Sequence, residues 1–393
     1  MRKALAAAAL VSLVLVGGAQ AGVTVYGPSS AMRVLVLVPG YGGGGGTFAQ
    51  VGPVLVEHVP NLQVWTVDRR GVALEDRTGF ATGDPAAAYG YYLGQQQVSG
   101  RRFDANLPPK LPRAKSWGLA ATLGDLRRIV LRARAGGKRK VILGGHSFGA
   151  ATAATYAAWD FGGHPGYRDL SGLVFVDGGE LGTFGTPTAS KVKADLAQLA
   201  ANANPFEDQL RAGVPWLFGV FAQLAALSAQ VAPDAPSTLA QSPLVPPALR
   251  PPGNPTNAQF FAFAATADGF DTNRCGLGNV ASLIAGPDAV EWYFPTRLRI
   301  DLLGASSLGP DPVTRLLGLR LTHLHEIDVP VYAFATSGYP GSLTAARTLI
   351  AQSRAPRASS RLAQDPAMKH SDPLCTPYPK SRFLQTLVGW LRR

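Results

Sequence analysis

The sequence predicts an α/β fold, in which a mostly parallel central sheet carries helices on both faces and an inserted, mainly helical cap. Short apolar, β-branched runs alternate along the chain with helical patterns, which is typical of such sheets. The runs are nearly continuously apolar, as expected of strands buried on both faces. The alternation stops after Asp177 and resumes near Ile327, which indicates a large insertion in the core.

Five apolar runs, each closed by Gly, Asp or Pro, are predicted to be core strands. They are Arg33–Val38, Gln63–Asp68, Lys140–Leu143, Leu173–Asp177 and Val329–Ala335. Helical patterns lie between and after these runs, and we expect right-handed crossover connections. The predicted core helices are Phe48–Val59, Trp117–Ala135, Phe148–Phe161, Ser342–Ser353 and Pro379–Arg392.

The insertion is predicted to form a cap over residues 181–325, between a first core part at 22–180 and a second at 326–393. Pro-rich joints separate its helical patterns, which are Ala189–Ala203, Glu207–Val231 and Ala258–Ala267. The segment Gly79–Pro112 is rich in Gly, Pro and Tyr, and we expect it to be a long ordered loop near the cap.

Composition and charge exclude several classes of protein. The 393 residues are 46% hydrophobic and 16% charged, which is too apolar for a disordered chain. The formal net charge is +12, but the densest basic run, Arg127–Lys140, has no interleaved aromatic residues to stack on bases. Such a run is typical of the solvated face of a helix, so no nucleic-acid partner is expected.

The N-terminus has the pattern of a signal peptide over residues 1–21. Arg2 and Lys3 precede an apolar stretch at Ala4–Val16, and Ala19-Gln20-Ala21 supplies a cleavage site. The apolar stretch is too short to span a membrane, and no later stretch is long enough. We therefore expect an exported protein, secreted or periplasmic, without a membrane span.

Cys275 and Cys375 are the only cysteines. Two are too few for a disulfide scaffold or an iron–sulfur site. An exported chain can hold a disulfide between them, and the alternative is two buried free thiols.

The sequence Gly145-His146-Ser147-Phe148-Gly149 follows an apolar strand and opens an Ala-rich helix. This G-x-S-x-G pattern is typical of a strained turn that presents a nucleophilic Ser at the end of a sheet. Ser147 is therefore the predicted nucleophile. The backbone N–H of Phe148, at the helix N-terminus, would face the reacting carbonyl.

A Gly-rich turn at Pro39–Gly46 follows the first core strand and can offer a second backbone N–H, that of Tyr41, to the same oxyanion. A phosphate-binding loop is the alternative for such a run of glycines. No G-x-x-x-x-G-K-[ST] motif follows and no Lys lies nearby, so nucleotide binding is not expected.

A Ser nucleophile needs a base, and His370 is the best of the six histidines. It lies in a short loop after the last sheet segment and before the C-terminal helix. His146 adjoins the Ser and is expected to point away from its Oγ. His323 and His325, with Glu326, lack a fourth partner for zinc, and we expect loop histidines there.

The third member of a triad must orient the base. Catalytic groups gather at the carboxyl ends of parallel strands, and Asp177 lies at such an end. The run Val329–Ala335 ends without an acid. Asp177 is the first choice, and its rivals are Glu180, Asp365 and Asp372.

Together these residues resemble the α/β-hydrolase superfamily, in its capped branch. The likeness rests on the Pro39–Gly42 turn, on Asp68-Arg69-Arg70-Gly71, on the Gly145–Gly149 elbow and on the His370 loop with its final helix. The resemblance implies Ser147 as nucleophile, His370 as base, and Tyr41 and Phe148 as oxyanion donors. Most relatives carry the acid one strand later than Asp177, so this chain would use a known variant.

The resemblance implies a serine esterase or lipase that takes a small-molecule ester, without a metal or an organic cofactor. Ser at the elbow argues against dehalogenases and epoxide hydrolases, and the large cap argues against cutinase-like enzymes. Apolar residues at Trp216–Leu227 would either bind acyl or aryl groups or form the core of the cap. Two alternatives stay open: a prolyl-aminopeptidase-like or other amide hydrolase, with Glu207 or Asp208 binding the amine, and a non-catalytic binding protein. The sequence predicts no oligomeric state.

Overall fold

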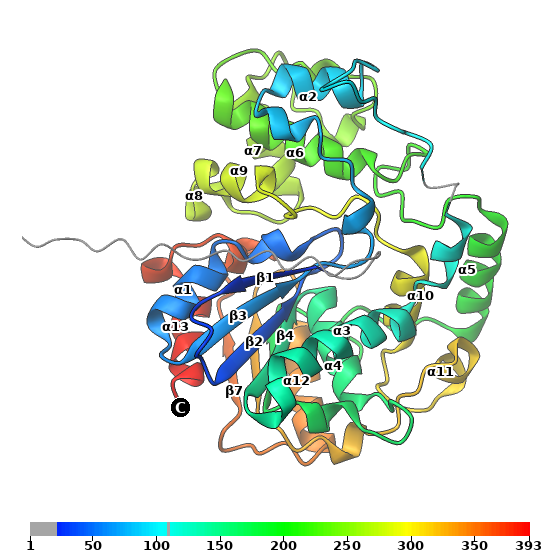
Figure 1. Ribbon diagram of the computed structural model, residues 1–393, viewed down its shortest axis with the longest axis vertical. Coiled ribbons are helices and arrows are strands. Elements are labelled where there is room, and N and C mark those ends of the chain that lie inside the picture. The colour runs from blue at the N-terminus through cyan, green and yellow to red at the C-terminus, as the bar shows by residue number, and fades with distance from the viewer. Residues whose placement is uncertain (1–21, 108–110) are drawn as a thin grey trace, which may run out of the picture.

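The computed structural model describes residues 22–107 and 111–393 (Figure 1). The predicted signal peptide, 1–21, lies outside these residues. The described residues contain a seven-stranded sheet of order β1-β3-β2-β4-β5-β6-β7, in which β1 runs antiparallel to β3 and all other neighbours are parallel. The strands are β1 Val23–Tyr26, β2 Arg33–Val38, β3 Leu62–Val67, β4 Lys140–His146, β5 Gly172–Val176, β6 Val331–Ala335 and β7 Arg361–Gln364. The sheet and its flanking helices confirm the predicted fold class.

The five predicted strands correspond to β2 to β6. The two strands that were not predicted, β1 and β7, lie at the edges of the sheet. Each edge strand has four residues, and β7 has no fully buried side chain, so neither shows a continuous apolar run. Strand β4 extends beyond the predicted Leu143 through Gly144 and Gly145. A Cβ on Gly144 would lie 2.5 Å from the Val174 carbonyl oxygen, so the neighbouring strand requires glycine there.

Helices cover both faces of the sheet. Helices α1 (Val51–His58) and α13 (Arg382–Leu391) pack on one face, and α3 (Leu119–Arg134), α4 (Phe148–Ala158) and α12 (Gly341–Gln352) pack on the other. Alternate side chains of each strand enter the two resulting cores. In β2, for example, Leu35 and Leu37 enter the first core, and Val34 and Val36 enter the second. A parallel sheet buried in this way needs apolar residues on both faces of its strands.

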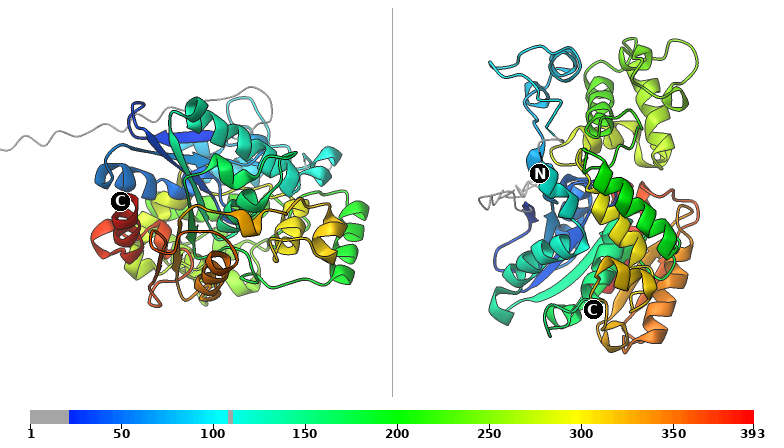
Figure 2. Two further views of the ribbon diagram at one scale, coloured as in Figure 1. Left: turned by 90° about the horizontal axis from the view of Figure 1, so that it is seen from below. Right: turned by 90° about the vertical axis from the view of Figure 1, so that its right-hand side faces the viewer.

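The insertion is helical, and its helices form two groups. Helices α6 (Leu217–Val231), α7 (Asn257–Ala267), α8 (Thr272–Cys275) and α9 (Leu277–Ala285) form the cap above the sheet (Figure 2). Helices α5 (Ala189–Ala201), α10 (Thr296–Gly304) and α11 (Pro312–Leu317) pack on one another, and α10 also packs on α3 and α4. The stretch 181–325 thus contains a cap and a second group of helices that extends the core.

Two expectations about local structure were wrong. Helix α6 begins at Leu217 rather than Glu207, after a stretch that contains Gly213 and Pro215, both poor helix formers. The segment expected to be a loop, Gly79–Pro112, contains helix α2 (Pro85–Tyr92), which packs on α6. Asp84 caps α2 by accepting a hydrogen bond from the Ala86 N–H. Residues 108–110 of this segment lie outside the description. No described helix is long and apolar enough to cross a membrane.

Candidate active site

Ser147 lies at a tight turn between β4 and α4. Its backbone φ of 55° is in the left-handed region, where residues other than glycine are strained. A Cβ on Gly145 would lie 2.4 Å from the carbonyl oxygen of Val38, and one on Gly149 would lie 1.9 Å from it. The two glycines of the motif therefore permit the close approach of strand and helix at the elbow.

Two more glycines make room around Ser147. A Cβ on Gly40, in the loop after β2, would lie 3.0 Å from the Ser147 Cβ, and one on Gly178, after β5, would lie 2.3 Å from the Ser147 carbonyl oxygen. The Ser147 N–H donates a hydrogen bond to the Val176 carbonyl (2.9 Å), which fixes the turn to the neighbouring strand. The loops of three adjacent strands thus converge on this serine.

His370 and Asp177 are joined by a hydrogen bond of 2.7 Å between Nδ1 and Oδ2. Asp177 is fully buried, and its carboxylate also accepts the backbone N–H (2.7 Å) and the hydroxyl (2.6 Å) of Thr336, which follows β6. Burial opposes ionisation, but the hydrogen bonds from His370 and Thr336 hold the pKa of Asp177 below its usual value. With Nδ1 bound to an ionised Asp177, Nε2 is the imidazole atom left for proton transfer.

The three rival acids do not hydrogen-bond His370. The Asp372 carboxylate accepts the backbone N–H groups of Asp271 and Lys369, both at 2.7 Å. The Asp365 carboxylate accepts the N–H of Ala367 (3.0 Å). Glu180 is buried, and its Oε1 has no hydrogen-bond partner among the described residues. Asp177 is the acid that the structure brings to the histidine.

His146, the neighbour of the serine, contacts His370 rather than solvent. Its Nε2 lies 2.9 Å from the carbonyl oxygen of His370, and the two ring centroids are 4.4 Å apart. Burial, with the nearby His370 adding to it, lowers the pKa of His146 to about 3. A neutral imidazole that donates from Nε2 therefore holds the backbone of the predicted base.

The two predicted oxyanion donors lie in the loop after β2 and at the start of α4. In the described part of the chain, no acceptor takes the backbone N–H of Tyr41 or of Phe148. The guanidinium of Arg69 supports the loop by donating to the carbonyl oxygens of Gly40 (3.1 Å), Gly43 (3.1 Å) and Pro39. Arg69 is itself held by Glu291 at 2.9 Å, in a buried ion pair. Sequence reasoning missed this support, although Arg69 lies in a stretch on which the family resemblance rested.

The glycines after Tyr41 pack against the backbone of residues 287–291. Gly44 and Gly46 donate hydrogen bonds to the carbonyls of Ala289 (3.2 Å) and Asp288 (2.8 Å). A Cβ on Gly46 would lie 2.0 Å from the Pro287 carbonyl oxygen. The run of glycines is therefore explained by a close backbone contact with the chain that leaves the cap, and not by a phosphate.

A cavity of about 380 Å³ separates the cap from the sheet, and both Ser147 and His370 line it. No hydrogen bond joins the side chains of these two residues among the described contacts. The cavity is mainly apolar; its walls include Phe218, Phe221, Val245, Leu249, Phe260, Phe261, Phe270, Ile284 and Leu374. Helix α6 serves both of the roles expected of it: Phe218 and Phe221 line the cavity, whereas Leu217 and Leu224 are buried in the cap core.

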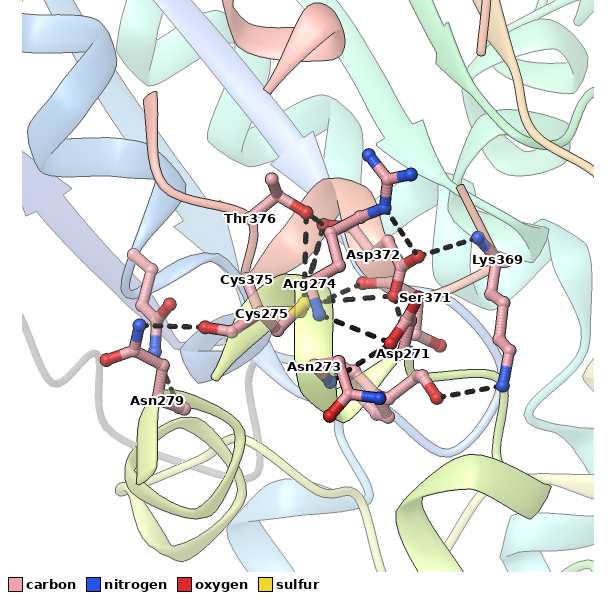
Figure 3. Close-up of a disulfide and its surroundings, with 12 residues drawn as sticks. Asp271, Asn273, Arg274, Cys275, Asn279, Lys369, Ser371, Asp372, Cys375 and Thr376 are labelled. Carbon is pink, nitrogen blue, oxygen red and sulfur yellow. Dashed lines mark hydrogen bonds and ion pairs between the residues drawn. A yellow bond between two sulfur atoms is a disulfide. The ribbon is translucent and has the colours of Figure 1, made fainter. Parts of the chain in front are cut away.

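The loop that carries His370 is bonded to the cap (Figure 3). Cys275, at the end of α8, and Cys375 form a disulfide. Ser371 donates from its backbone N–H to Gly269 (2.9 Å) and from its hydroxyl to the Asp268 carbonyl (3.1 Å). The two cysteines and Asp372 lie close enough together to suggest metal ligands, but their sulfurs are bonded to each other.

The remaining sequence candidates lie outside this site. His323 pairs with Glu326 at 3.0 Å, and His325 hydrogen-bonds the Gln352 carbonyl. Glu207 accepts a hydrogen bond from the Tyr41 hydroxyl (3.1 Å) and pairs with Arg299 (2.8 Å). In the basic run, Arg127 and Arg134 both pair with Asp169.

Comparisons with known proteins agree with the fold described above. A family profile described as alpha/beta hydrolase fold matches residues 33–227. A solved structure of a candidate lipase from Sulfolobus solfataricus superposes with a TM-score of 0.54 and 13% identity, over 97% of this chain and 98% of that one. This chain has the α/β-hydrolase fold.

Other solved structures are similar at lower scores. An esterase from Thermogutta terrifontis has a TM-score of 0.47 and 14% identity, over 97% of each chain. A soluble variant of monoglyceride lipase from Saccharomyces cerevisiae has a TM-score of 0.46 and 14% identity, over 99% of this chain and 96% of that one. No curated protein matches this chain in sequence.

Proposed function

We propose that this α/β hydrolase is a serine esterase that cleaves carboxylic esters of apolar acyl or aryl groups through an acyl-enzyme. One observation carries the proposal: the buried Asp177 holds His370 at 2.7 Å, and His370 shares an apolar cavity with the strained Ser147. An oriented base, a nucleophile at a sheet end and two unpaired N–H groups form the arrangement that acyl transfer requires.

In this mechanism, the Oγ of Ser147 attacks the ester carbonyl carbon while Nε2 of His370 takes the hydroxyl proton. The carbonyl oxygen becomes an oxyanion between the N–H groups of Tyr41 and Phe148, and each such donor typically contributes about 10²–10³ in rate. The C–O bond then breaks, and His370 returns the proton to the leaving alcohol. Water, activated by the same His370, hydrolyses the acyl-enzyme and regenerates Ser147.

The apolar walls of the cavity support acyl or aryl substrates, because burial of such groups is favourable. The pattern of residues 1–21 supports export of the protein. N-terminal sequencing of the mature protein tests export: a chain that begins at Gly22 supports it, and one that retains Arg2 contradicts it.

Two measurements test the proposed chemistry, each with Ser147→Ala as the matched control. A fluorophosphonate probe should label the wild-type protein once, on Ser147, and should not label Ser147→Ala. A panel of p-nitrophenyl esters of increasing acyl length should be hydrolysed by the wild type alone, although both proteins should have similar melting temperatures. Label on another serine, or ester hydrolysis by Ser147→Ala, would overturn the assignment. A protein that neither reacts nor hydrolyses would point to the non-catalytic alternative.

A further inference from the structure

The active-site cavity contains one acidic side chain and no lysine or arginine among the described residues. The acid is Asp268, the residue that ends helix α7 of the cap. Its side chain is exposed and lines the cavity, together with Ser147 and His370. A single carboxylate in a mainly apolar binding site is a strong determinant of which ligands the site accepts.

The backbone around Asp268 is fixed next to the predicted base. The carbonyl of Asp268 accepts the Ser371 hydroxyl, and the following Gly269 lies so close that a Cβ there would be 3.2 Å from the Cβ of His370. Gly269 has a φ of +85°, which favours glycine at this turn. The backbone that carries the Asp268 side chain is thus held beside His370.

The Asp268 carboxylate itself has no hydrogen bond or ion pair within the described chain. The two nearby cations bind elsewhere. Lys369 donates to the Phe270 carbonyl (3.4 Å), and Arg274 donates to the Ala367 carbonyl (3.0 Å) and lies 3.8 Å from both Asp365 and Asp372. Although its surface is open to the cavity, the Asp268 carboxylate is surrounded by protein and removed from bulk water, which raises its pKa to about 6; the nearby His370 opposes this shift.

Aromatic rings also line the cavity that contains this carboxylate. The seven Phe and Tyr residues that line it are Tyr41, Phe218, Phe221, Phe260, Phe261, Phe270 and Tyr339. Aromatic faces attract cations, and a carboxylate that lacks a partner gains more from a cation than one already paired. We propose that this cavity accepts an ester that carries a positively charged ammonium group, and that Asp268 binds that group. The inference rests on the proposed esterase activity and narrows its substrates to cationic esters.

The test compares two pairs of esters that have the same shape and differ in charge. One pair carries the charge on the acyl side: p-nitrophenyl 4-(trimethylammonio)butanoate and p-nitrophenyl 5,5-dimethylhexanoate. The other carries it on the alcohol side: butyrylcholine and 3,3-dimethylbutyl butanoate. In at least one pair, the wild type should prefer the cation in kcat/KM by about tenfold or more. The pair that shows the preference identifies the side of the ester that meets Asp268.

Asp268→Asn should abolish this preference, because it should lower kcat/KM for the cationic esters by about tenfold more than for their neutral counterparts. Asp234→Asn is the matched control, because Asp234 is an exposed cap residue outside the cavity and its loss changes the net charge equally. It should retain the preference. Absence of any preference in the wild type would overturn the proposal. Equal slowing of cationic and neutral esters by Asp268→Asn would also overturn it, because Asp268 would then act through His370.

A binding measurement separates this proposal from the esterase assignment. Butyltrimethylammonium should bind the Ser147→Ala protein in calorimetry at pH 8, and Asp268→Asn in the same background should weaken binding by about tenfold or more. Equal binding by the two proteins would overturn the ammonium site even if neutral esters are hydrolysed. Binding that depends on Asp268 would support the site even if hydrolysis fails.

Discussion

Nε2 of His146 lies 2.9 Å from the carbonyl oxygen of His370, so the residue before the proposed nucleophile holds the loop of the proposed base. The G-x-S-x-G motif therefore does more than expose its serine. Its second residue joins the strand–helix turn at β4 to a loop more than two hundred residues later in the chain. We therefore expect His146 to be a positioning residue that acts through His370.

Replacement of His146 by Phe should lower kcat by roughly tenfold and change KM little, because the contact orients the base without contacting the substrate. His146→Gln can still donate a hydrogen bond and should recover most of the loss. The pH dependence of kcat should keep its shape in His146→Gln, since the pKa of His146, near 3, lies below the range of the assay. The idea fails if the Phe and Gln variants are equally active.

Replacement of Asp177 by Asn should reduce kcat by roughly 10³–10⁴, as expected when the imidazole loses its orienting carboxylate. The Asn side-chain oxygen can still accept a hydrogen bond from Thr336. The melting temperature should therefore change little while kcat falls. Asp365→Asn is the control. In the described structure, the Asp365 carboxylate accepts the Ala367 N–H and lies 3.8 Å from Arg274, and it does not contact His370. Near-normal activity in Asp177→Asn, together with loss in Asp365→Asn, would show that the acid is misassigned.

The pH dependence of stability should show that Glu180 is protonated in the folded protein. Burial without a partner raises the pKa of Glu180 well above its usual value, so the folded state retains a proton that the unfolded chain releases. The free energy of unfolding therefore falls as pH rises above about 4.5. Glu180→Gln removes this penalty and should raise the melting temperature at pH 8 by about 2 °C or more, with little change at pH 4.

The control for Glu180 is Glu57→Gln, since Glu57 is exposed on α1. Its melting temperature should follow that of the wild type at both pH values. The kcat of Glu180→Gln should also stay near the wild-type value, because Asp177 occupies the position beside His370. If the gain in melting temperature of Glu180→Gln over the wild type is no larger at pH 8 than at pH 4, Glu180 is not a buried, protonated carboxyl in the folded protein.

Loss of the disulfide should affect both stability and activity. The bridge between Cys275 and Cys375 closes a separation of 100 residues and ties α8 to the loop of His370. In the chain-entropy model, such a bridge contributes about 4–5 kcal/mol at most, so Cys275→Ser/Cys375→Ser should unfold more easily. Its kcat should fall, because His370 loses part of its support.

Thiol titration of the denatured, unreduced protein checks the bridge directly. The wild type should have no titratable thiol, and two per chain would refute the pairing. A reducing agent should lower the melting temperature of the wild type and leave that of the double serine variant unchanged. This comparison separates the loss of the bridge from other effects of the reductant.

The sequence by itself determined the core of the fold. Strands β2 to β6 are nearly continuous apolar runs because both of their faces are buried, and each run shows this pattern in its own sequence. The edge strands β1 and β7 are short and depend on a single neighbour, so no local pattern distinguishes them. The G-x-S-x-G motif was likewise readable because a strained turn needs particular residues in sequence.

Only the tertiary structure decided which distant residues meet. The sequence favoured Asp177 over Glu180, Asp365 and Asp372 by its place at a strand end, and only the hydrogen bond to His370 distinguishes it by contact. The support of the oxyanion loop by Arg69 and the presence of Asp268 in the cavity also depend on segments that fold together from far apart. The physical reason is that local preferences act over a few residues, whereas pairing of charges and burial of carboxylates are settled by packing across the whole chain.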